Sequence, residues 1–213
     1  MSFEKRTQAP EKKVGHEPLS RLRVRHDPVI AVLCSDLHLF HSPPAVRSNE
    51  NWYGVMERYL RQLGKLSAQH SAPIICAGDV FDRWNPPPEL INFVIDSIPN
   101  EHGFYAIPGQ HDLPHHRYQD IERSGYWTLV AAGRIVNLEP CMAHRINSFQ
   151  VVPFPWGFPL EPCQKEESLV QLAVVHCYVW KDASTSYPQA PKDKNVRSLR
   201  KILKTYDASV FGD

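Results

Sequence analysis

The chain has 213 residues, of which 42% are hydrophobic and 22% are charged, values typical of a globular protein with one sizeable core. Its formal net charge of +1 at pH 7 excludes a strong overall field toward nucleic acid, so any such contact must come from local patches. The sequence shows no signal peptide and no run of about eighteen apolar residues, which argues against export and membrane insertion.

The first 27 residues are polar and carry many lysines and arginines. Such a segment predicts a flexible arm, and residues 28–213 are then expected to form a single domain. Two interpretations of the arm stay open: its charges are simply solvated, or they touch a phosphate backbone.

Strand-like and helix-like segments alternate along the domain. Apolar runs predict strands at 29–34, from Ile74 to the Gly78-Asp79 pair, and at 104–107, 134–138, 148–153, 169–179 and 208–211. Helical spacing predicts helices at 49–69 and 89–97, a weak one at 118–132, and a basic amphipathic one around 192–206. This alternation favours an α/β fold.

Two segments are expected to be irregular. The prolines within 152–159 remove backbone donors, which predicts an ordered aromatic loop rather than a strand. Residues 181–191 read as a linker-like loop. The cysteines form no Cys-x-x-Cys pair and three lie in apolar runs, so we expect reduced, structural thiols and a cytoplasmic location; they are Cys34, Cys76, Cys141, Cys163 and Cys177.

Residue types that bind metals follow four of the predicted strands. In open α/β sheets such side chains gather at the carboxyl ends of the strands. Asp36 and His38 lie two residues apart, so both can reach one ion, and Asp79 is expected to bridge two ions. The remaining candidates are Gln110, His111, Asp112 and His176.

Each candidate is weak alone, because Asp-x-His, Gly-Asp and single histidines are common by chance; their occurrence in order carries the prediction. The oxygen of Gln110 could complete the second metal, and His111, oriented by Asp112, could face the substrate. Asp82 is expected to hold the turn or a ligand histidine. Mixed carboxylate and imidazole ligands favour Mn²⁺, Fe²⁺ or Zn²⁺ over Ca²⁺ or Mg²⁺.

In these motifs the chain resembles the calcineurin-like metallophosphoesterases, whose pattern is D-x-H, G-D-x-x-D, G-N-H-D/E, a lone H and G-H-x-H. The matching positions are Asp36 to His38, Gly78 to Asp82, Gly109 to Asp112, and His176. Gln110 replaces the usual asparagine, and Gly212-Asp213 stands where the last motif begins, so Asp213 replaces its first histidine. We therefore expect a chain truncated within that motif, with Asp213 as a possible second-metal ligand.

The resemblance implies a four-layer αββα sandwich of two mixed sheets flanked by helices, and two divalent ions, with Mn²⁺ favoured and Fe²⁺, Zn²⁺ or Mg²⁺ as alternatives. It implies metal-dependent phosphodiester hydrolysis in which Asp36 and His38 hold one ion, Asp79 holds both, and Gln110, His176 and Asp213 hold the other, with His111 acting on the substrate.

Within the family the chain looks most like the SbcD-type DNA-repair nucleases, a likeness that includes residues 108–114. That placement implies an exonuclease or endonuclease acting on DNA, a homodimer and an SbcC-type ATPase partner. Two alternatives stay open: a phosphoesterase on small phosphodiesters or phosphoproteins, and a non-catalytic binding module that keeps only the fold.

Overall fold

The structure is a computed structural model that describes residues 28–47, 51–166, 168–179 and 196–213. The predicted N-terminal arm (1–27) and the predicted loop at 181–191 lie outside these ranges.

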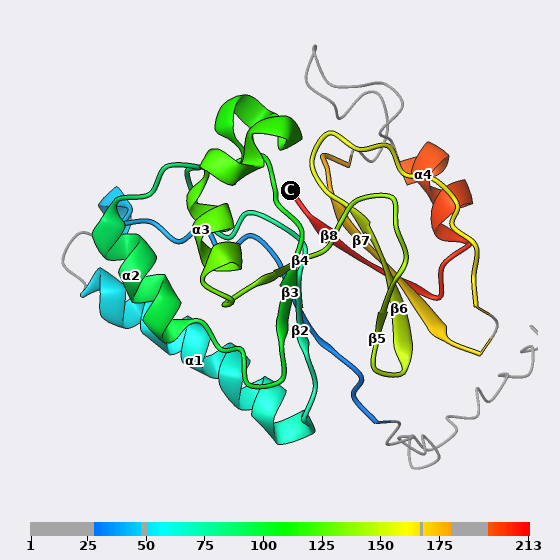
Figure 1. Cartoon of the computed structure of the whole chain (residues 1–213), viewed down its shortest axis with the longest axis horizontal. Helices are drawn as coiled ribbons and strands as arrows, with labels where there is room; N and C mark the ends of the chain where they lie inside the picture. Colours follow the sequence, from blue (N-terminus) through cyan, green and yellow to red (C-terminus); the bar gives the residue numbers. More distant parts are fainter. Residues whose placement is uncertain (1–27, 48–50, 167, 180–195) are drawn as a thin grey trace, which may run out of the picture.

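The first sheet is built from four short strands in the order β1-β2-β3-β4, and every neighbouring pair is parallel. Parallel neighbours need long crossovers, which the helices of this half supply. Helices α1, α2 and α3 cover its outer face (Figure 1). The strands are β1 (Val32–Cys34), β2 (Ile74–Cys76), β3 (Phe104–Ala106) and β4 (Val136–Asn137), and the helices are α1 (Trp52–His70), α2 (Pro88–Ser97) and α3 (Gly125–Ala131).

The second sheet has the order β5-β6-β7-β8, in which β5 is antiparallel to β6 and the other pairs are parallel. Helix α4 lies on its outer side (Figure 1). The strands are β5 (His144–Ile146), β6 (Phe149–Phe154), β7 (Val170–His176) and β8 (Ala208–Gly212), and α4 covers Val196–Leu203.

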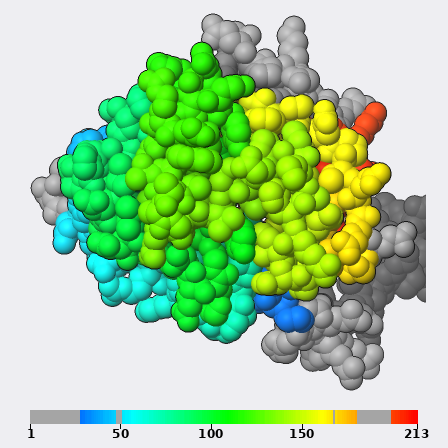
Figure 2. Space-filling view, in the orientation of Figure 1, coloured from blue at the N-terminus to red at the C-terminus, as the bar shows by residue number. Residues whose placement is uncertain are grey.

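The two sheets pack face to face around an apolar core. Ile75 and Ile107 of the first half contact a cluster that includes Phe149, Val151 and Val174 of the second. Figure 2 shows the two halves, cyan to green and yellow-green to yellow, meeting in one continuous surface. The expected helix–sheet–sheet–helix layering is confirmed, but the first sheet is purely parallel over its described strands, not mixed as expected.

The expectation of a loop at 152–159 is wrong for its first residues, because β6 runs on through Pro153 to Phe154. The partner β5 pairs only with residues 149–151, so Pro153 lies where β6 has become an edge strand. A missing N–H donor is tolerated at such an edge. Strand β5 itself was not predicted.

The weakly helical stretch 118–132 is two elements: a 3₁₀ helix, η4 (Tyr118–Arg123), followed by α3. Ser124 separates them, since its hydroxyl oxygen accepts a hydrogen bond from the Trp127 N–H (3.1 Å) and caps α3. Two further 3₁₀ turns are η2 (Ala45–Arg47) and η3 (Pro114–His116). No helix in the described ranges combines the length and apolar character that crossing a lipid bilayer requires.

Candidate metal centre

The predicted ligands meet at one edge of the sandwich because of how the strands run. Strands β1, β2 and β3 are parallel neighbours, so the loops that follow them emerge at the same edge. These loops carry Asp36 and His38, Asp79 and Asp82, and Gln110 to Asp112. His176 ends β7 of the second sheet and faces them.

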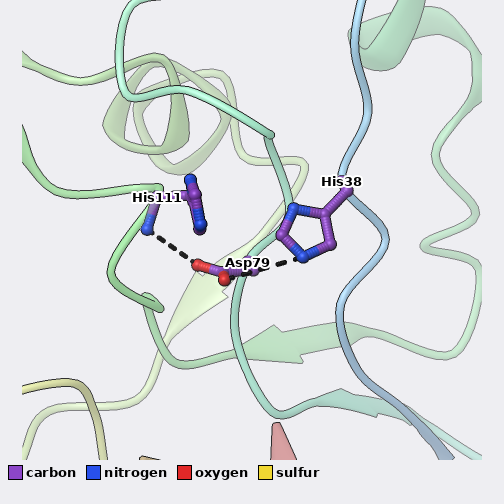
Figure 3. A group of neighbouring side chains, drawn as sticks. All are labelled: His38, Asp79 and His111. Atoms are coloured by element: carbon purple, nitrogen blue, oxygen red, sulfur yellow. Dashed lines mark hydrogen bonds and ion pairs between the residues drawn. The ribbon is translucent and has the colours of Figure 1, made fainter. Parts of the chain in front are cut away.

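Asp79 is the centre of the arrangement and its side chain is fully buried. Its Oδ1 accepts a hydrogen bond from the backbone N–H of His111 (2.9 Å). Its Oδ2 has no hydrogen-bond partner among the described residues, yet it lies 3.8 Å from His38 Nε2 and 3.4 Å from His176 Nε2. Figure 3 shows Asp79 between His38 and His111.

Two groups of side chains have ligand atoms within 4.8 Å of one another: His38, Asp79 and His111, and Asp36, Asp79 and His176. Asp79 belongs to both. A buried carboxylate oxygen without a hydrogen bond, facing imidazole nitrogens on two sides, is a costly arrangement unless a cation shares it. The donor set therefore fits two divalent ions that accept oxygen and nitrogen ligands.

His176 is held in an orientation suited to metal binding. Its Nδ1 lies 2.6 Å from the carbonyl oxygen of Ala77, which can only accept, so Nδ1 donates. This leaves Nε2 toward the site, 2.6 Å from Gln110 Oε1. A backbone acceptor on the far nitrogen is the usual support of a ligand histidine.

Charge couples His176 to Asp79. Burial lowers the pKa of His176, but the close negative charge of Asp79 outweighs this effect and raises the pKa overall. Burial likewise acts to raise the pKa of Asp79, and the close contact with His176, together with the backbone N–H of His111, overcomes it, so that this pKa is lowered. Each group therefore favours the charged form of the other, and since a metal binds the neutral imidazole, ion binding and protonation compete at His176.

The partners of Asp112 are backbone groups and not the His111 ring. Its buried carboxylate accepts hydrogen bonds from the backbone N–H groups of Val80, Phe81 and Gly109, at 3.1, 2.9 and 3.0 Å. Burial raises the pKa of Asp112 to about 7, against the lowering effect of these donors. Asp112 thus ties two loops together.

Asp82, rather than Asp112, supports two histidines of the site, His38 and His111. The backbone carbonyl of Asp82 lies 3.0 Å from His111 Nδ1, and its carboxylate lies 3.3 Å from His38 Nδ1. The expectation that Asp112 orients the His111 ring is therefore corrected: the partner of that ring is the backbone of Asp82.

Asp213 belongs to neither ligand group within the described chain. Its backbone N–H donates to Asp36 Oδ1 (3.1 Å), and Ser35 Oγ donates to the other oxygen of Asp36. Burial raises the pKa of Asp213, and the neighbouring charges of Asp36 and Asp79 add to this against the opposite effect of His176. The side chain predicted as a ligand thus lies beside the centre, while its backbone holds Asp36.

Gly78 permits the close packing around His176. Its φ is +100°, and a Cβ at this position would lie 2.2 Å from His176 Nδ1. Only glycine fits both the left-handed backbone and the contact.

Sequence reasoning missed the aromatic residues on the second-sheet side. The Gln110 amide nitrogen lies 3.5 Å from the Tyr178 hydroxyl, and the Trp156 ring lies 5.2 Å from the Tyr178 ring and 6.4 Å from His176. Tyr178 was open to prediction, because it stands two residues beyond His176 at a strand end. His116 Nδ1 lies 2.9 Å from the Gln110 carbonyl and so contacts the turn that carries the site.

The family described as calcineurin-like phosphoesterase matches residues 31–212. No curated protein matches the chain. Among solved structures 35 chains match, and one crystal structure aligns over 86% of this chain and 83% of that chain, at 12% sequence identity and a TM-score of 0.44.

Proposed function

The chain belongs to the calcineurin-like phosphoesterase family, and from this premise we propose that it is a divalent-metal-dependent phosphodiesterase that degrades DNA. Metal-dependent phosphoester hydrolysis follows from the family. The observation that carries the proposal is the buried Asp79 carboxylate, which is common to two ligand groups.

The chain's own residues divide the work around Asp79. Asp36 and His38, whose Oδ1 and Nε2 atoms lie 3.9 Å apart, would hold one ion and Gln110 and His176 the other, as the sequence pattern implies. The ligand groups of the structure instead join Asp36 to His176 and His38 to His111. When bound, such a pair polarises the phosphoryl oxygens and lowers the pKa of an attacking water toward about 7.

His111 is the candidate general acid. The Asp82 carbonyl accepts from His111 Nδ1, which leaves Nε2 directed away from this support and available to the leaving oxygen. The backbone N–H of His111 also donates a hydrogen bond to Asp79 Oδ1, which links the residue of the proposed acid directly to the shared carboxylate.

A polymeric substrate is supported by a cavity of about 280 Å³ next to His111. Its lining includes Arg83, Asn85, His115 and His116, all of which can donate hydrogen bonds to phosphate oxygens. A phosphate next to the scissile one could bind in this cavity. A small phosphoester has no such second phosphate. Mn²⁺ as the ion, a homodimer and an SbcC-type ATPase partner are further proposals that rest on the sequence resemblance alone.

The test is hydrolysis by the purified, metal-stripped chain after addition of Mn²⁺. We expect linear DNA to be degraded, p-nitrophenyl phosphate to be a poorer substrate, and Asp79→Asn to lose both metal and activity. Asp96→Asn, an exposed carboxylate change on α2, is the matched control and should behave as wild type. Faster turnover of the monoester than of DNA would contradict the nuclease proposal.

A further inference from the structure

A second cavity, of about 600 Å³, opens directly onto the metal centre. One side of it is formed by Asp36, His38 and Asp82, the residues around the first proposed ion. Its volume falls within the roughly 300–1,000 Å³ of small-molecule sites. A group bonded to a phosphate at the metal centre would therefore have room on this side.

Three aromatic residues also line this cavity, and two of them come from a separate part of the fold. Phe40 lies in the loop after β1, while Trp52 and Tyr59 lie on α1. The lining between them is apolar, including the buried Met56 and Leu60. Within the described chain, Asp36, His38 and Asp82 are the only acidic or basic side chains that line this cavity, so the rest of its interior offers stacking and apolar contact rather than ion pairing.

The aromatic wall is held in place before any ligand arrives. Trp52 Nε1 donates a hydrogen bond to the carbonyl oxygen of Phe40 (2.7 Å), which ties α1 to the loop. The Arg83 guanidinium lies 4.9 Å from the centre of the Phe40 ring, and Arg47 donates to the Tyr59 hydroxyl (3.2 Å). A preorganised wall loses little conformational entropy when it binds a planar ring.

We infer that this cavity receives a nucleobase of the nucleotide whose phosphate lies at the metal centre, which makes unpaired DNA, single-stranded or frayed at an end, the preferred substrate. The inference rests on the proposed function and deepens it. Aromatic side chains bind bases by stacking without reading their sequence. A base inside a duplex is already stacked and paired, so it must leave the helix to enter.

The test uses two synthetic diesters with the same leaving group: methyl p-nitrophenyl phosphate and the p-nitrophenyl ester of thymidine 5′-monophosphate. Both release p-nitrophenolate at the same centre, and only the second offers a base. We expect wild type to favour the thymidine ester in kcat/KM, mainly through a lower KM. Tyr59→Ala and Phe40→Ala should reduce this preference by about 5- to 140-fold, which corresponds to the loss of one stacked base.

Two further variants keep the test decisive. Leu66→Ala removes an exposed side chain of α1 outside the cavity lining and should leave the preference unchanged. Ser42→Phe adds a ring to the loop that lines the cavity and should lower the preference even if Phe40→Ala does not fold.

The outcomes distinguish a failure of the proposed function from a failure of the base-binding cavity. If wild type hydrolyses neither ester, the proposed function fails. If it hydrolyses both with equal kcat/KM, the phosphodiesterase stands and the base-binding cavity is overturned. A preference that Tyr59→Ala, Phe40→Ala and Ser42→Phe all leave intact would also overturn it, as would degradation of blunt duplex DNA as fast as of single strands.

Discussion

At the scale of single residues, the centre is built on unusual backbone. Asp36, His38 and Asp79 adopt left-handed φ angles of 52°, 42° and 51°. Such conformations cost about 1–3 kcal/mol each for residues other than glycine and persist where surrounding contacts hold them. Here the N–H groups of Asp36 and His38 donate to the carbonyls of Gly78 and Asp79, both at 3.0 Å, so that two loops fix each other. The strain therefore coincides with the proposed ligands.

The role of His111 is tested by His111→Ala. Alanine keeps the backbone N–H that holds Asp79 and removes only the ring, so we expect two equivalents of metal to remain while kcat falls by about 10²- to 10⁴-fold. Metal analysis and steady-state kinetics on the same preparation are the measurements.

His70→Ala, on the exposed end of α1, is the control for removing an imidazole and should change neither quantity. Parallel loss of metal and activity in His111→Ala would instead make His111 a ligand, as its place beside His38 and Asp79 also permits.

The fit of Gly78 is tested by Gly78→Ala, with Gly133→Ala as its match. Both positions have positive φ, but a Cβ on Gly133 meets nothing within 4 Å, whereas one on Gly78 meets His176. We expect Gly133→Ala to cost about 1–2 kcal/mol of unfolding free energy, from backbone strain alone. Gly78→Ala should cost clearly more and should also weaken metal binding. Urea unfolding and metal titration measure the two effects. Equal losses of unfolding free energy in the two variants would show that the contact of a Cβ at position 78 with His176 does not matter.

At the scale of elements, α1 serves the fold on one face and the site on another. Helical spacing places Val55, Met56, Tyr59 and Leu66 on one apolar stripe, but the buried hydrophobic side chains of this helix are Val55, Met56 and Leu60, whereas Tyr59 and Leu66 are 50% and 39% exposed. Trp52 and Tyr59 extend from the same helix to the cavity beside the metal centre. The packing of the helix thus sets the position of the proposed base-binding wall.

That dependence is tested by Leu60→Ala, which removes a side chain with 1% exposure. We expect a loss of about 2–5 kcal/mol in unfolding free energy, since a cavity forms in the core. Leu66→Ala, on the same helix with 39% exposure, should cost far less. Thermal or urea unfolding followed by circular dichroism compares the two, and similar losses would mean that α1 is not packed as described.

At the scale of the whole molecule, the centre joins the two sheets. The loops after β1, β2 and β3 supply most of the ligands, while His176 comes from β7 and contacts Ala77 of the first half. Ions held from both sides would therefore stabilise the docking of one sheet on the other, in addition to the apolar core between them.

We expect Mn²⁺ at about 100 times its dissociation constant to stabilise the chain by about 2.7 kcal/mol for each of the two ions bound. For a protein of this size that corresponds to a rise in Tm of about 5–11 °C per ion. Asp79→Asn should show no such rise. The protonated imidazole has no lone pair for an ion, and the pKa of His176 is raised, so the rise in Tm should shrink as the pH falls below that pKa. Calorimetry across pH with and without Mn²⁺ provides the measurement, and a rise of equal size in Asp79→Asn would place the ions elsewhere.

By itself, the sequence determined that an α/β chain places Asp36, His38, Asp79, Gln110, His111 and His176 at strand ends, because apolar runs and short motifs are local signals. Tertiary structure alone decided which of them meet. The purely parallel first sheet, the contact of Asp82 rather than Asp112 with the His111 ring, and the cavity between Phe40 and α1 all depend on segments far apart in the chain. Their geometry is set by packing between those segments, and the periodicity of any single segment carries no information about it.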